Sequence, residues 1–164
     1  MKKLVVLLFM ILPLGAFAQE VKIAYVNTGE VINLMPELGE LETKMAALNA
    51  QYEKDFKQMQ DEYTKKYTEF MEQEKELTEN IKLRRQEELQ TMMDRIQNFA
   101  PVAQQDIEKT QSELFAPIQK KLTDAIKAVG EEQGYTCIIN PQVLLYTGTA
   151  IDATQLVKTK LGLK

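Results

Sequence analysis

Residues 36–134 combine a long apolar periodicity with very few glycines, and this feature most limits what the chain can fold into. Between Pro36 and Gly134 the only glycines are Gly39 and Gly130. Apolar residues recur every three or four positions, which predicts helix because that spacing puts them on one face. The phase changes near Thr78, a residue type that favours helix N-termini. We therefore predict an antiparallel helical hairpin over residues 36–134, with its tip near residues 78–82.

Each predicted arm carries one apolar stripe with a single polar interruption, at Glu74 in the first arm and at Thr110 or Gln111 in the second. The first stripe comprises Leu34, Leu38, Leu41, Met45, Leu48, Tyr52, Phe56, Met59, Tyr63, Tyr67, Phe70, Leu77 and Ile81. The second comprises Leu89, Met92, Ile96, Phe99, Ala103, Ile107, Leu114, Ile118, Leu122, Ile126 and Val129. We expect the two stripes to pack against each other, and we call this contact the seam.

The arms are too long to lie inside a compact domain of this size. A helix of about 40 residues, rising about 1.5 Å per residue, is a rod of roughly 60 Å. Acid-before-base pairs at i,i+4, such as Glu40 with Lys44 and Glu53 with Lys57, are typical of a solvated helix face. The hairpin is therefore expected to project from the rest of the protein.

The N-terminus has the pattern of an export signal. Lys2 and Lys3 precede an apolar run over residues 4–14, and Ala16-Phe17-Ala18 forms a small-x-small cleavage site. The run is shorter than the roughly 20 residues that span a bilayer. We predict a signal peptide over residues 1–18, cleaved after Ala18, and a soluble mature chain outside the cytoplasm.

Short strands are predicted at both ends of the mature sequence. Val21–Val26 alternates β-branched and aromatic residues, and strands are also predicted at about Thr136–Ile139 and at Val143–Tyr146. A short helix is expected over residues 30–35, and Asp152 is expected to cap a final helix that ends near Leu161. The fold class is thus α+β, mostly α, with a small β-rich body built from residues 19–35 and 135–164.

Three short strands and one helix bury little area, so this body is expected to be marginal as a single copy. Sharing one sheet body among several copies would pool their apolar faces. Cys137 is the only cysteine and cannot form a disulfide within its own chain. The strand residues expected at the contacts between subunits are Ile23, Tyr25, Cys137, Ile139, Leu144 and Tyr146.

Two prolines, Pro101 and Pro117, interrupt the second arm. Each removes a backbone hydrogen bond and crowds the carbonyl four residues earlier, which predicts kinks. Two interpretations stay open. The prolines bend the arm to follow its partner, or they are hinges that let the arms spread.

The composition argues against an enzyme. The chain has no histidine, no cluster of metal ligands, no phosphate-binding glycine loop and no nucleophile paired with a base. We predict no catalytic activity, cofactor or metal. After loss of Lys2 and Lys3 the chain holds 18 basic and 24 acidic residues, a net charge of −6, which argues against nucleic acid as a partner.

The sequence resembles the Skp/OmpH family of periplasmic chaperones over essentially the whole mature chain. The similarity lies in the opening Lys22–Asn27, the charged hairpin, the block Ala128–Asn140, Leu144-Leu145-Tyr146 and the short final helix. The resemblance implies a jellyfish-like homotrimer, in which a β-rich body carries three helical arms around a cavity. It also implies that unfolded outer-membrane proteins are held there without ATP.

The chain departs from the family in its charge. Family members are basic, and that charge is linked to lipopolysaccharide contact, whereas the mature net charge here is −6. The acidic charge argues against lipopolysaccharide as a ligand.

Four apolar residues lie beside the seam positions and are candidates to contact an unfolded client protein: Met71, Met93, Val102 and Phe115. Methionine suits a promiscuous surface because its thioether side chain is flexible and polarisable. A wider seam is the alternative interpretation of the four. A different class of function also stays open, namely a structural or adaptor protein of the cell envelope that binds a fixed partner through its coiled-coil hairpin.

Overall fold

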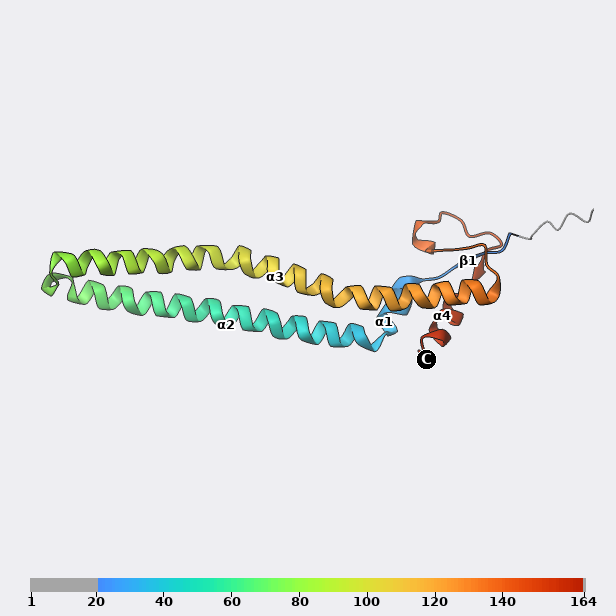
Figure 1. Ribbon diagram of the computed structural model, residues 1–164, viewed down its shortest axis with the longest axis horizontal. Helices are drawn as coiled ribbons and strands as arrows, with labels where there is room; N and C mark the ends of the chain where they lie inside the picture. The colour runs from blue at the N-terminus through green and yellow to red at the C-terminus, as the bar shows by residue number, and fades with distance from the viewer. Residues whose placement is uncertain (1–20, 164) are drawn as a thin grey trace, which may run out of the picture.

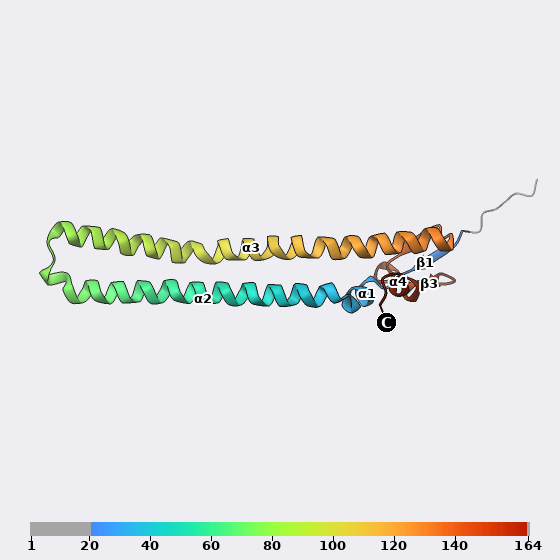
Figure 2. The same ribbon diagram turned by 60° about the horizontal axis from the view of Figure 1, so that its bottom comes forward.

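The computed structural model describes residues 21–163, so the predicted signal peptide, residues 1–18, lies outside the described part. Two long helices, α2 (Pro36–Gln73) and α3 (Glu79–Gln133), run side by side, and the short elements gather at one end (Figures 1 and 2). The short elements are β1 (Ile23–Tyr25), α1 (Thr28–Leu34), β2 (Cys137–Ile139), η2 (Pro141–Val143), β3 (Ile151–Asp152) and α4 (Thr154–Lys160). The prediction of a mostly helical chain with a small sheet is confirmed.

The bounds of the two arms follow from local backbone chemistry. Pro36 occupies the first turn of α2, where its missing N–H costs nothing. Gly134 ends α3 in the left-handed conformation, with φ 68°, and its N–H bonds the carbonyl of Gly130. With 38 and 55 residues, the helices are roughly 57 Å and 83 Å long at about 1.5 Å per residue.

The turn between the arms lies slightly earlier than the sequence suggests. The 3₁₀ turn η1 (Glu74–Glu76) and two further residues join the helices, so residues 79–82 of the predicted tip already belong to α3. Thr78 is the N-cap of α3, but its side chain makes no capping hydrogen bond. The apolar stripe therefore located the turn to within one helical turn.

Helix α3 continues through both prolines. Figure 1 shows it bending across the segment that contains Pro101 and Pro117, whereas it looks nearly straight in Figure 2. Both prolines lie on exposed positions, where a bend can relieve their crowding without disturbing the seam. The prolines therefore bend α3 without ending it.

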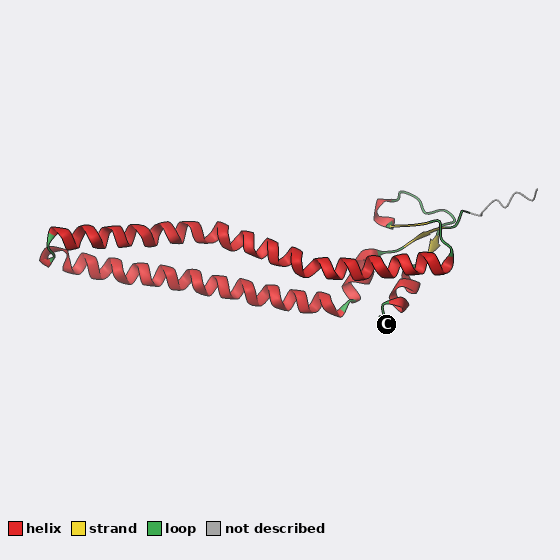
Figure 3. Ribbon diagram, viewed as in Figure 1, coloured by secondary structure: helices red, strands yellow, loops and turns green. Residues whose placement is uncertain are grey.

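The three strands form one parallel sheet in the order β2-β1-β3 (Figure 3). The N-terminal strand β1 lies in the centre, and both of its neighbours come from the C-terminal part of the chain. Ile23 is in register with Cys137, and Ala24 is in register with both Ile138 and Ile151. The hairpin is thus inserted between strands that pair directly with each other.

The predicted strand at Val143–Tyr146 is wrong. Pro141 begins the 3₁₀ turn η2, in which Asn140 Oδ1 accepts a 3.1 Å hydrogen bond from the N–H of Gln142, and the chain is irregular from Leu144 to Ala150. The second edge of β1 pairs with β3 instead. Both edges of β1 are thus occupied by β2 and β3, and Leu144 and Tyr146 are loop residues.

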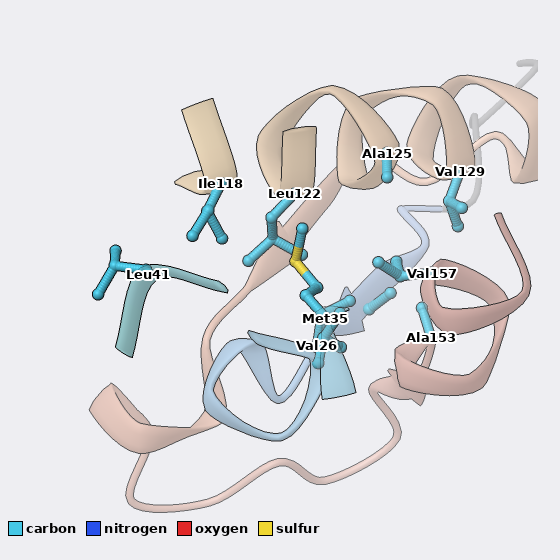
Figure 4. Close-up of a cluster of buried hydrophobic side chains, with 11 residues drawn as sticks. Val26, Met35, Leu41, Ile118, Leu122, Ala125, Val129, Ala153 and Val157 are labelled. Carbon is cyan, nitrogen blue, oxygen red and sulfur yellow. The ribbon is translucent and has the colours of Figure 1, made fainter. Parts of the chain in front are cut away.

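The hydrophobic core lies where the last turns of α3 pass over the sheet and α4. Figure 4 shows Leu122, Ala125 and Val129 of α3 pointing toward the body, with Val157 of α4 facing them. Val157 is fully buried. We use the name body for the unit formed by α1, the sheet, α4 and the end of α3. The long helix α3 thus belongs both to the hairpin and to the body.

Candidate functional site

One face of the sheet carries those predicted subunit-contact residues that lie in strands. Successive side chains of a strand point to opposite faces, so Ile23 and Cys137 share the face opposite to Ala24. Ala24 is completely buried in the core, whereas Ile23 is 39% exposed and Cys137 is exposed. The outer face of the sheet is therefore open, in contrast to the face that packs on the helices.

A groove beside this face brings together four of the six predicted contact residues. Its lining comprises Val21, Lys22, Ile23, Ile139, Leu144, Tyr146, Thr147, Thr149, Ala150 and Ile151. Tyr25 and Cys137 do not line it. Next to the groove, the loop exposes Val143, Leu145 and Tyr146, with exposed fractions of 74%, 106% and 86%. We call these three residues together with the groove the apolar body surface.

Val143, Leu145 and Ile151 also belong to this surface, although they were not predicted as contact residues. The run Val143–Tyr146 was recognised as apolar, but a strand with one buried face would have hidden alternate side chains. Because the segment forms a loop, three of its four side chains are exposed. The useful signal was an apolar run directly after Asn140-Pro141, a pair that favours turns.

A tyrosine and an aspartate stabilise the rim of the sheet. Burial first, and then the neighbouring charge and hydrogen bond of Asp152, raise the pKa of Tyr25 above its ordinary value. Hydrogen bonding, chiefly from Thr154, lowers the pKa of Asp152. The backbone N–H of Thr154 donates a 2.9 Å hydrogen bond to Asp152 Oδ1. Asp152 therefore links β3 to the first turn of α4, but the N-cap residue of α4 is Ala153 and not Asp152 as predicted.

A second candidate site lies near the tip of the hairpin. We call it the tip groove, and its lining comprises Tyr63, Tyr67, Phe70 and Met71 of α2 with Gln86, Leu89, Gln90 and Met93 of α3. Phe70 and Leu89 are nearly buried and form its floor, whereas Met71 is 50% exposed. The rings of Tyr63 and Tyr67 are stacked with centroids 6.1 Å apart. Met71 and Met93, predicted as client contacts from separate arms, thus meet in one groove.

The other two predicted client contacts lie elsewhere. Val102 is 64% exposed, but it follows Met93 by nine residues and so points to about the opposite side of α3. Phe115 is half-buried and packs against the core of the body. The structure therefore groups the two methionines and separates Val102 and Phe115 from them.

Comparisons with known proteins agree with this architecture. The family described as Outer membrane protein (OmpH-like) matches residues 22–161. The chain belongs to this OmpH-like family. An OmpH-like protein from Caulobacter crescentus CB15, a candidate outer membrane chaperone, shares the fold with the OmpH-like chain described here. The TM-score is 0.73 at 12% identity, over 85% of this chain and 82% of that one. No curated protein matches the chain.

The OmpH-like hairpin carries ion pairs between its arms on exposed or half-exposed side chains. Lys66 pairs with Glu88 across the arms, and the hydrogen bond from Lys66 holds the pKa of Glu88 below its usual range. At the root of the hairpin, Lys121 pairs with Glu37 and lowers the pKa of that carboxyl. Solvent screens ion pairs on such exposed side chains, so these pairs favour the correct alignment of the two helices and add little to the strength of their contact.

Within residues 21–163, no helix is both long and apolar enough to cross a membrane. In the same residues, no three acidic, cysteine or histidine side chains cluster in a way that could hold a metal ion.

Proposed function

We propose that this OmpH-like protein is an ATP-independent holdase of the periplasm, which binds unfolded outer-membrane proteins between its helical arms and prevents their aggregation. The observation that carries the proposal is the tip groove. It places the exposed Tyr67 and Met71 beside the half-buried Met93 on a hairpin that stands away from the body. An exposed aromatic and methionine surface can repack against many sequences, as a chaperone of unfolded chains requires.

We also propose that three copies assemble through the apolar body surface. Leu145 and Tyr146 are almost completely exposed in the single chain, and an apolar surface of this kind marks an interaction site. Assembly of three bodies would place three tip grooves around one client. Weak contacts at each groove would then sum through effective concentration, without a deep pocket.

The holdase proposal is tested by diluting a urea-unfolded outer-membrane protein into buffer and following light scattering. The mature chain should suppress aggregation at near-stoichiometric amounts. The variant Met71→Ser/Met93→Ser should remain an oligomer by sedimentation but protect the client less well, because it loses the flexible apolar side chains of the groove. Equal protection by the variant would reject the tip groove as the contact surface.

Val102→Ser is the matched comparison, since it removes a similarly exposed apolar side chain from the other side of α3. It should protect the client as the unsubstituted chain does. A fixed-partner adaptor, in contrast, would not suppress aggregation in any of these forms.

The assembly proposal is tested with Leu145→Asp/Tyr146→Asp. Buried like charges would oppose association, so sedimentation should show a shift from trimer to monomer. Gln155→Asp, on the exposed surface of α4, should leave the trimer intact. A monomeric unsubstituted chain would contradict the assembly proposal directly.

A further inference from the structure

The tip groove differs from the other grooves of this chain in its charge. None of the eight residues that line it is ionisable at neutral pH, whereas the groove at the root of the hairpin includes Glu37, Glu40, Lys44 and Lys121. Charged residues make up 27% of the sequence. A charged occupant would lose its hydration in the tip groove without gaining an ionic partner. The groove is therefore expected to bind uncharged groups more tightly than charged ones.

Glutamines and Met93 extend the groove along α3, with the carboxylate of Asp94 beside them on the outer side. Gln86, Gln90, Met93 and Gln97 are spaced by four, three and four residues, so they share one face of the helix. The three glutamines are exposed. We call the face made by Tyr67, Met71, Gln86, Gln90, Met93 and Gln97 the neutral edge of the hairpin.

The opposite edge of the hairpin is charged. There Lys66 of α2 forms its ion pair with Glu88 of α3. Lys66 is one residue before Tyr67, and Glu88 is one residue before Leu89, so each lies about 100° around its helix from the groove residue that follows it. The two edges of the same hairpin thus offer different chemistry to a ligand.

The side chains of the neutral edge match the groups of an extended peptide. A glutamine amide can donate to a backbone carbonyl and accept from a backbone N–H. The Nε2 group of Gln90 donates a 2.8 Å hydrogen bond to Asp94 Oδ1, which leaves its carbonyl oxygen available as an acceptor. Tyr67 and the two methionines offer apolar contacts between these amides.

We infer that the neutral edge binds an extended, uncharged segment of an unfolded polypeptide that carries aromatic or branched apolar side chains. From Gln86 to Gln97 the helix rises roughly 16 Å, which equals about five residues of extended chain. A helical partner fits less well, because it needs a continuous apolar stripe and the edge alternates amides with isolated apolar side chains. The inference rests on the proposed holdase function and names the class of segment that the arms hold.

The test introduces charge without changing shape. Gln86→Glu/Gln90→Glu adds two carboxylates to the neutral edge at nearly unchanged helix propensity. Gln58→Glu/Gln105→Glu is the matched control on exposed positions of the outer helix faces. Each double variant also removes one i,i+4 amide–carboxylate bond, Gln90 with Asp94 or Gln58 with Glu62.

The probes are a fluorescently labelled peptide of alternating tyrosine and serine, and two versions of it with aspartate or lysine in place of serine. Binding to the mature full-length chain is followed by fluorescence anisotropy. The unsubstituted protein and the control should bind the neutral peptide best. The edge variant should bind the aspartate peptide at least about threefold more weakly than the control does, which is the usual size of a surface charge effect. Of the three peptides, the edge variant should bind the lysine peptide most tightly.

The outcomes separate the two proposals. If the unsubstituted chain suppresses client aggregation but the edge variant and the control bind all three peptides alike, the neutral edge is not the binding track and the holdase function stands. If the unsubstituted chain neither suppresses aggregation nor binds any of the peptides, the holdase function itself is wrong.

Discussion

The hydroxyl group of Tyr52 on α2 donates a 2.6 Å hydrogen bond to the carboxylate of Asp106 on α3. The ring of Phe99 meets Tyr52 edge-on and stacks on Phe56, in both cases with centroids 5.8 Å apart. We call these four residues the aromatic clamp. It holds the two arms together beside Pro101, where α3 lacks one backbone N–H.

Removing the hydroxyl group of Tyr52 should loosen the middle of the hairpin. Tyr52→Phe keeps the ring but leaves Asp106 without its donor, so amide hydrogen exchange should speed up around residues 99–106 and change little in the body. Gln105→Ala is the control, since Gln105 is exposed and lies next to Asp106. Unchanged exchange in the Tyr52 variant would mean that the aromatic contacts alone hold the arms.

The same hydrogen bond predicts a loss of stability at high pH. The bond to Asp106 raises the pKa of Tyr52 above its ordinary value of 10.0. A raised folded-state pKa means that the stabilisation is fully present below the ordinary value and is lost as pH rises through the higher one. The stability difference between the unsubstituted chain and Tyr52→Phe should therefore shrink above pH 10, as measured by denaturant unfolding at fixed pH. A difference that stays constant to higher pH would contradict this linkage.

The hinge hypothesis for Pro101 and Pro117 predicts a change in the spread of the arms. Pro101→Ala/Pro117→Ala restores two backbone donors and should stiffen α3. With one spin label at the tip of each hairpin, in a Cys137→Ser background, the distances between the hairpins of the assembly should then have a narrower distribution. If the mean distance changes but the width does not, the prolines bend the arm and are not hinges. Gln105→Ala provides the control for a substitution between them.

Leu122 connects the hairpin to the body, because its helix passes directly over the core and its side chain is only 4% exposed. Leu122→Ala should lower the free energy of unfolding by about 2–5 kcal/mol, the usual effect of a cavity in a packed core. Leu83→Ala, at a residue that is 58% exposed, should change it by less than about 0.5 kcal/mol. Denaturant unfolding at a fixed protomer concentration measures both, since assembly also contributes to stability.

Asp152 should make the stability of the body depend on pH in the acidic range. Its folded-state pKa is lowered, first by the hydrogen bond from Thr154, so its contribution is present above the ordinary pKa of 3.8 and is lost as pH falls through the lower value. Asp152→Ala removes the hydrogen bond that the N–H of Thr154 donates and should cost about 1 kcal/mol at neutral pH. The gap between the two proteins should close in acid, and a gap that widens instead would contradict the assignment.

The two long helices could be predicted because the spacing of apolar residues along the sequence indicates a helix. The pairing of the strands in the sheet could not be predicted in this way. Periodicity alone located the seam, including Phe70 and Leu89, which are nearly buried in the structure. The strand β3 has only two residues, Ile151 and Asp152, too few for any alternation to appear. The apolar run before it has higher strand propensity, but tertiary pairing decides which segment lies beside β1.

The residues of the candidate sites likewise differ in whether local sequence spacing reveals them. Met71 and Met93 were found as apolar residues beside the seam, because helical spacing reveals such positions. Gln86 and Gln90 were not, since an exposed glutamine on a helix carries no signal of its own. The role proposed for Gln86 and Gln90 depends on the uncharged residues of α2 that lie beside them. The apolar stripe of one helix does not predict which residues of the other helix will lie there.

The central position of β1 bears on how this protein is made. Its hydrogen-bonding partners on both sides lie more than a hundred residues downstream, as the bond from the backbone N–H of Asn27 to Thr154, 127 residues away, also illustrates. The hairpin can form early from contacts between its two helices, but β1 keeps both edges unpaired until residues 137–139 have been made, and one edge until residues 151–152 follow. A nascent chain that stalls before residue 137 would therefore present a complete hairpin beside a strand with two unpaired edges, which is the state most exposed to proteolysis and aggregation.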